Sequence, residues 1–63
     1  MEQVNVNVAK ARTMLGMVSA ESCIDSSLLL DDEVFCKLIT DYAHNLTVDD
    51  AVARLMIHVN ENY

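Results

Sequence analysis

The amino-acid sequence predicts an all-α fold: one domain over residues 1–63, with three helices near 6–21, 31–45 and 47–61, that self-associates through helix packing. Apolar residues recur at three- and four-residue steps, the spacing that aligns side chains on one helix face. A chain of 63 residues has room for about three helices of ordinary length. Its apolar fraction of 52% exceeds what so small a monomer buries well, so the excess is expected at an interface.

The segment near 47–61 has the clearest helical pattern. Thr47 is placed to cap this helix, because its hydroxyl oxygen is able to accept a backbone amide of the first turn. Asp49 and Asp50 follow in that turn, where the helix dipole favours negative charge. The apolar face, predicted to form core or an oligomer interface, contains Val48, Val52, Leu55, Met56 and Val59.

The segment near 31–45 is predicted to begin with Asp31 as its N-cap. Leu30 precedes that cap and Phe35 follows it, which is the pairing of a hydrophobic staple. Only Leu46 separates the end of this helix from the next cap, so the two helices are expected side by side or at a sharp angle. The buried face is predicted to include Phe35, Leu38, Ile39 and Tyr42.

The first segment has two interpretations. Val4–Val8 alternates strictly between valine and asparagine, which is typical of a half-buried strand. The same stretch also fits the start of a helix over 6–21, with Leu15 and Val18 on its buried side. The helix is favoured because the residues from Ala9 onward are good helix formers.

Two local features qualify this helix and the connection that follows it. Gly16 marks either a close helix crossing or a tolerated weak position, and the sequence favours neither. In residues 19–30, serines interrupt the apolar pattern, so this stretch is predicted to be the connection. A short helical turn through Ile24 fits within it. Leu28–Leu30 form an apolar run that must be covered in part.

Composition limits the partners. Ten acidic residues against four basic ones give a formal charge of −6, which disfavours direct contact with nucleic acid or an anionic membrane and favours a basic protein. No apolar run reaches the length of a membrane span. Cys23 and Cys36 lie in apolar surroundings, which is typical of reduced, buried thiols. We therefore expect a cytoplasmic protein that binds itself and a second, basic or DNA-binding protein, with no membrane partner.

No grouping of residues indicates an enzyme, a cofactor or a metal. Cys23, Cys36, His44 and His58 are residue types that bind zinc, but they are spaced too widely for the paired ligands of a structural zinc site. Nucleophilic catalysis needs a cysteine in contact with a base, and Cys36 and His44 lie about two helical turns apart. We predict no catalytic residue, no cofactor and no metal site.

Ile57 predicts a second surface on the last helix. On a helical wheel it falls opposite the centre of the apolar face. A single exposed isoleucine is common, so the inference depends on the apolar surplus as well. The predicted partner-binding face contains Asp50, Ala53, Arg54, Ile57 and Glu61.

The acidic runs Asp31–Glu33 and Asp49–Asp50 have two interpretations. They complement helix N-termini, or they imitate the phosphate groups of a nucleic acid for a DNA-binding partner. Capping is favoured because both runs fall where helix starts are predicted. The second interpretation stays open because five acids exceed what two helix starts need.

Two stretches are similar to known families. Val4–Val8 resembles the strand of ribbon–helix–helix repressors, which pairs across a dimer and reads DNA. Those strands and their flanks are usually basic, whereas only Lys10 and Arg12 are basic here. Asp25–Leu28 resembles the Asp-Ser-Leu of acyl carrier proteins, whose serine carries the prosthetic group, with the leucine displaced by one residue.

These features favour a small acidic regulator that binds another protein through helices. An antirepressor, an antitoxin or an inhibitor that sequesters a DNA-binding partner fits this description. The alternative is a DNA-binding regulator of ribbon–helix–helix type that uses Val4–Val8 as its strand. An acyl-carrier-like protein, modified at Ser26 or Ser27, is a more distant alternative.

Overall fold

The computed structural model describes the backbone of residues 2–63 and the side chains of residues 8–63. This part of the chain is helical and contains no strand, which confirms the predicted all-α class. The predicted three long helices are present, and a short fourth lies in the connection. The helices are α1 (Glu2–Ser22), α2 (Ser26–Leu30), α3 (Glu33–Asn45) and α4 (Val48–Asn62).

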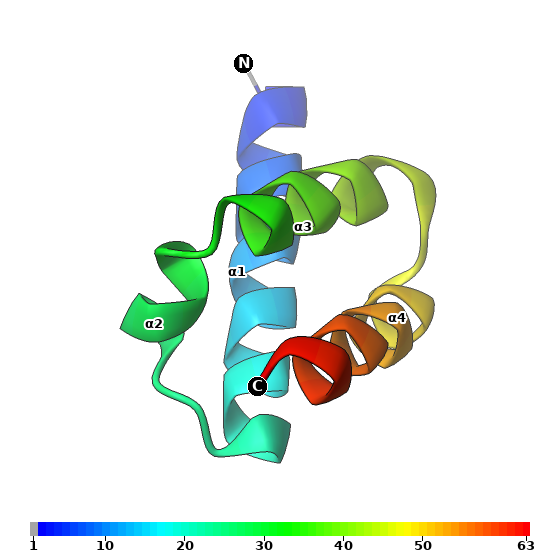
Figure 1. The fold of residues 1–63 in the computed structure, drawn as a ribbon. Helices are drawn as coiled ribbons and strands as arrows, with labels where there is room; N and C mark the ends of the chain where they lie inside the picture. The colour runs from blue at the N-terminus through cyan, green and yellow to red at the C-terminus, as the bar shows by residue number, and fades with distance from the viewer. Residues whose placement is uncertain (1) are drawn as a thin grey trace.

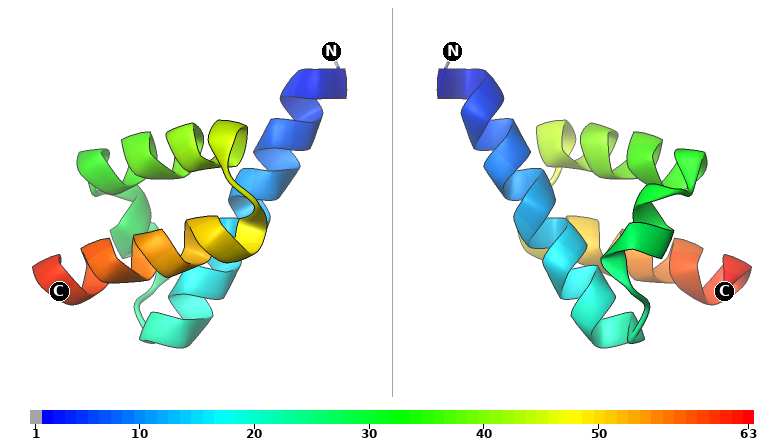
Figure 2. Two further views of the ribbon diagram at one scale, coloured as in Figure 1. Left: turned by 90° about the vertical axis from the view of Figure 1, so that its right-hand side faces the viewer. Right: turned by 90° about the vertical axis from the view of Figure 1, so that its left-hand side faces the viewer.

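The helices α3 and α4 run in opposite directions, and α1 crosses both of them (Figures 1 and 2). Contacts join α1 to α3 and α4, and α2 packs on α1 and α3. The first turns of α1 extend past α3 and α4, as the blue end of the ribbon in Figure 2 shows. The core therefore lies where the second half of α1 meets the antiparallel pair.

All four helices contribute to one core. Phe35 and Leu55 are fully buried at its centre, each worth about 1.5–3 kcal/mol of hydrophobic stabilisation. Met14 and Leu29 are also fully buried, although the sequence did not single them out as core. Every residue predicted for the core or an oligomer interface lies in this core or packs against it. The buried ones are Val18, Phe35, Ile39, Val52, Leu55 and Val59, and the partly buried ones are Leu15, Leu38, Tyr42, Val48 and Met56.

The start of α1 differs from the prediction. The helix begins at Glu2 rather than near residue 6, so Val4–Val8 lies within it and does not form the alternative strand. The side chains of residues 4–7 lie outside the described residues. Gly16 is exposed, and a Cβ there would meet no described atom within 4 Å, so it is a weak position and not a close crossing.

The cap of α3 is Asp32 and not Asp31, which corrects the prediction by one residue. The Asp32 carboxylate accepts the Phe35 amide at 3.1 Å. Asp31 instead ends α2, where its amide donates to the Ser27 and Leu28 carbonyls. Leu30 is 54% exposed and lies two residues before the cap, so the predicted staple with Phe35 is wrong. Asp31, which the sequence predicted as the N-cap of α3, is instead the C-cap of α2.

Other helix ends are also capped, one of them by a side chain from a distant part of the sequence. The Asp50 amide donates to Thr47 Oγ1 at 3.3 Å, so the predicted cap of α4 is confirmed. The Lys10 ammonium donates to the carbonyl of Leu46, the residue that ends α3, where positive charge complements the helix dipole. Past the end of α1, Cys23 has a φ of 59°, a left-handed conformation that usually falls to glycine.

Candidate functional site

The predicted partner-binding residues lie together on the solvent side of α4. We call this strip the α4 outer face; all five of its side chains are exposed, and Ile57 near its middle is 57% exposed. Its members are Asp50, Ala53, Arg54, Ile57 and Glu61. The spacing explains the arrangement, because steps of three and four residues return to one side of a helix. The core residues of α4 occupy the opposite side.

Ile57 belongs to a wider set of exposed apolar side chains among residues 8–63. The others are Val8, Met17, Leu28, Leu30, Val34 and Tyr63. Ile57 lies among charged groups, with Asp50, Arg54 and Glu61 on the same face of the helix. An apolar centre with a polar rim is the usual anatomy of a protein interface.

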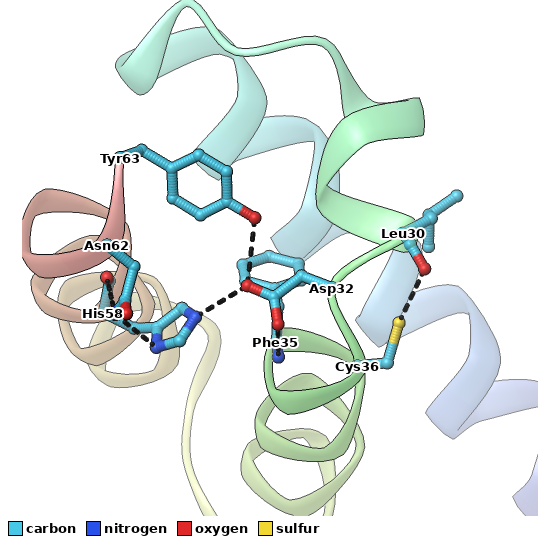
Figure 3. A network of polar contacts seen from close by, with 7 residues as sticks. All are labelled: Leu30, Asp32, Phe35, Cys36, His58, Asn62 and Tyr63. Carbon is cyan, nitrogen blue, oxygen red and sulfur yellow. Dashed lines mark hydrogen bonds and ion pairs between the residues drawn. The ribbon is translucent and has the colours of Figure 1, made fainter.

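A second constellation, missed by the sequence analysis, centres on Asp32 (Figure 3). Asp32 Oδ2 accepts hydrogen bonds from His58 Nε2 at 3.0 Å and from the Tyr63 hydroxyl at 2.9 Å. Asp32 Oδ1 accepts the Phe35 amide, so one carboxylate joins the start of α3 to the end of α4. No local signal could have revealed these partners, which lie 26 and 31 residues away along the chain.

The imidazole of His58 is held at both ring nitrogens. Asn62 Nδ2 lies 3.2 Å from Nδ1 and also donates to the His58 carbonyl. The tautomer that satisfies both contacts carries its proton on Nε2, facing Asp32. A catalytic triad would place a nucleophilic hydroxyl or thiol at the nitrogen turned away from the carboxylate. An amide occupies that position here, and the Asp32–His58 hydrogen bond joins the start of α3 to α4.

The same contacts shift two pKa values. The pKa of Asp32 is lowered to about 2, first by the hydrogen bond from His58 and then by the amide of Phe35. The pKa of Tyr63 is raised, first by burial of its hydroxyl and then by its bond to Asp32 and the negative charges of Asp32 and Asp31. At neutral pH, Asp32 is therefore ionised and Tyr63 is neutral.

The remaining candidate groups lie apart. Cys23 is exposed and Cys36 is partly buried, so the prediction of two buried thiols is wrong. Both are free thiols, and the Cys36 thiol donates to the Leu30 carbonyl at 3.3 Å. Among residues 8–63, no group of three or more histidine, cysteine or acidic side chains is placed to hold a metal ion. Within the described helices, none is both long and apolar enough to cross a membrane.

The acidic runs lie at helix ends, as the capping interpretation requires. Glu33 occupies the first turn of α3, and Asp49 and Asp50 occupy the first turn of α4. Asp31 closes α2 and Asp32 caps α3. Asp32 is partly buried, and the other four are exposed, so their charges remain open to a partner.

Comparison with known proteins gave no match: no family model, no curated protein and no solved structure is similar to this chain. The fold and the composition define a small acidic helical protein.

Proposed function

We propose that this protein is a regulator that binds another protein through the α4 outer face and sequesters it. The observation that carries the proposal is the exposure of Ile57, 57%, in a strip of charged side chains. Burying one such apolar residue within a polar rim is how interfaces concentrate their binding energy. An antirepressor, antitoxin or inhibitor of a DNA-binding protein is the type of regulator that we favour.

Charge supports a basic partner. The chain carries a formal charge of −6, and one of its four basic residues, Lys10, is engaged with the end of α3. A negative field accelerates encounter with a positively charged protein and opposes approach to DNA. The proposed role places the protein in the cytoplasm and needs neither an enzymatic activity nor a cofactor.

Self-association is the second part of the proposal. The accessible surface of 4265 Å² is close to the value of about 4,000 Å² expected for a compact monomer of this mass. The chain is therefore well packed, and self-association is inferred from the positions of its exposed apolar residues. Val8 is 44% exposed and lies in the first half of α1. The first turns of this helix extend past the other helices (Figure 2). A second copy that pairs along this part of α1 would cover it.

Sedimentation equilibrium tests self-association. We expect a dimer or a larger closed assembly at micromolar concentration, and dissociation in Val8→Asp, because a carboxylate would be buried without a partner. Met17→Asp is the matched control, since Met17 is 36% exposed and the helical repeat places it about 180° around α1 from Val8. A folded wild-type monomer at this concentration would refute self-association.

Affinity capture from an extract of the native host tests partner binding. Wild type and Val34→Asp should retain the same protein, and Ile57→Asp should lose it, since Val34 is 55% exposed on α3 and matches Ile57 in exposure. The captured protein should bind DNA, and adding the regulator should release that DNA in a gel-shift assay. Equal capture by all three proteins would show that the α4 outer face is not the binding surface.

The two alternative functions have their own tests. A ribbon–helix–helix regulator needs a strand at Val4–Val8, where α1 is helical, and would itself bind DNA with an affinity that falls steeply as salt rises. An acyl-carrier-like role would place a prosthetic group on Ser26 or Ser27, at the start of α2. The mass of the intact protein from its native host would reveal that modification.

A further inference from the structure

A shallow hollow lies at the end of the molecule where α1 ends, α2 begins and α4 ends. We call it the α1–α4 hollow. Three segments distant in sequence line it: the last turn of α1 with the loop that follows, the start of α2, and the last turns of α4. Its walls include Glu21, Ile24, Asp25, Leu28, Val59 and Tyr63.

The chemistry of the hollow is apolar at its base and acidic at its rim. Val59 is 2% exposed and Ile24 is partly buried, whereas Leu28 and Tyr63 present more than half of their surface. Glu21 and Asp25 are exposed carboxylates. Among the described residues that line the hollow, none is a lysine, arginine or histidine. A cation with an apolar neighbour is therefore the complementary ligand.

The hollow is held in shape by hydrogen bonds. The Tyr63 hydroxyl donates to Asp32 Oδ2, which directs the ring toward the start of α3 (Figure 3). The Ser19 hydroxyl donates to the Ile24 carbonyl at 2.6 Å and fastens the loop to α1. The Asp25 carboxylate accepts the Ser27 amide and caps α2. A preformed site loses less entropy on binding than a mobile one.

The charges around Tyr63 act in the same direction. Burial and the hydrogen bond to Asp32 raise the pKa of the Tyr63 hydroxyl, and the negative charges of Asp32 and Asp31 add to this shift. Those two charges, with the exposed carboxylates of Glu21 and Asp25, favour a positive group at this end of the molecule. The aromatic ring adds an attraction of its own, because the face of a tyrosine ring is electron-rich.

We propose that the α1–α4 hollow binds an arginine side chain that a partner protein presents beside an apolar residue. The guanidinium is planar and weakly hydrated, so it stacks on a tyrosine ring and pairs with carboxylates. Its neighbour packs against Leu28 and the base of the hollow. This surface is separate from the α4 outer face, and the proposal does not depend on the function proposed above.

Nuclear magnetic resonance of the ¹⁵N-labelled protein tests the proposal with a defined probe, acetyl-arginyl-leucine amide. The probe should shift the amide signals of residues 21–25 and 60–63 in a saturable manner, and salt should weaken the effect. The same peptide with citrulline in place of arginine keeps the shape but lacks the charge. The citrulline peptide should bind about two- to fivefold more weakly than the arginine peptide, the size of effect expected when exposed ion pairs are lost.

A matched pair of double variants separates the hollow from the overall charge. Glu21→Gln with Asp25→Asn removes two charges at the hollow and keeps the cap of α2, because asparagine caps a helix as well as aspartate. Glu33→Gln with Asp49→Asn removes two charges elsewhere. Only the first should weaken arginine binding. Equal weakening by both, or equal binding of arginine and citrulline, would overturn the proposal.

Two further variants complete the test. Tyr63→Leu keeps an apolar wall without the aromatic face and should weaken binding of the arginine peptide; unchanged binding would count against the proposed stacking. Ile57→Asp should leave binding of the peptide unchanged, because Ile57 does not line the hollow. Loss of peptide binding in Ile57→Asp would place the peptide on the α4 outer face and overturn the proposal for the hollow.

Discussion

The two faces of α4 differ in burial and in charge, although their residues are interleaved along the same fifteen positions. On the inner face, Leu55 is fully buried and Val59 is 2% exposed. On the outer face, Ile57 is surrounded by charged groups and is 57% exposed. The helical repeat alone divides the residues in this way. Residues of the same apolar character therefore serve stability on one side and remain available for binding on the other.

The edge between these faces carries a third role. His58 lies at that edge, with a side chain that is 14% exposed, and contacts Asp32 at the start of α3. It therefore links α4 to the start of α3 by a side-chain hydrogen bond. Substitutions on the inner face, at the edge and on the outer face should therefore differ in their effect on folding.

The inner face should show the largest effect. Leu55→Ala should lower the free energy of unfolding by about 2–5 kcal/mol, because it removes buried methyl groups and leaves a cavity. Val34→Ala, at an exposed position, should change it by less than about 0.5 kcal/mol. Chemical denaturation followed by circular dichroism measures both. Equal effects would mean that the inner face is not the core.

Substitutions at the edge should show the next largest loss of stability. The N-cap residues of α3 and α4, Asp32 and Thr47, provide the comparison. Thr47→Ala should cost about 1 kcal/mol, since Thr47 supplies only its local capping bond. Asp32→Ala should cost more, because it also removes the acceptor of His58 and Tyr63. The loss of stability in Asp32→Asn should lie between those of Thr47→Ala and Asp32→Ala, because asparagine still caps the helix but carries no charge. A smaller loss in Asp32→Ala than in Thr47→Ala would show that the tie between α3 and α4 contributes nothing.

Acid should weaken the same edge. The pKa of Asp32 in the folded protein is about 2, below its ordinary value of 3.8. Its ionised form is thus favoured by folding, so its stabilisation is complete above pH 3.8 and is lost as the pH falls toward 2. Thermal melting across this range should show a smaller decline in Asp32→Asn than in wild type. Identical declines would contradict the lowered pKa.

Alkali should also lower stability, because it removes the proton of the Tyr63 hydroxyl. The pKa of Tyr63 is raised above 10.0, so its neutral form is favoured by folding. Its stabilisation is complete below pH 10.0 and is lost as the pH rises through the raised value. Tyr63→Phe should remove this part of the alkaline decline. Absorbance titration in a Tyr42→Phe background, where Tyr63 is the remaining tyrosine, would locate the pKa directly.

The outer face should show the smallest effect on folding. Ile57→Asp should shift the free energy of unfolding by within about 0.5 kcal/mol, because the new carboxylate stays in water. Its helix content and melting temperature should match those of wild type. A strong loss of stability would place Ile57 in a self-association interface, and α4 would then be buried on both sides.

Much of the helical framework was predictable because its causes are local. The apolar repeat of α3 and α4 identified Phe35 and Leu55 as core, and it placed Ile57 on the solvent side. Thr47 was recognisable as a cap because its partner, the Asp50 amide, is three residues away. Such effects act within one helical turn, so neighbouring residues suffice to specify them.

Tertiary structure decided the features that join distant parts of the chain. In the sequence, Asp31 and Asp32 are equally suited to cap α3. Asp32 is the cap in the structure because Asp31 is the C-cap of α2. Gly16 fits a close crossing or an open surface equally well, and the path of α1 left it open.

The sequence by itself determined the class of fold, the repeat of α4 and the acidic charge, since each follows from composition or from spacing within a few residues. The bond from Asp32 to His58, the bond from Asp32 to Tyr63 and the α1–α4 hollow depend on how helices cross. Crossing angles are set by the fit of side chains from several helices at once, and that fit has no counterpart in the local pattern of any one segment.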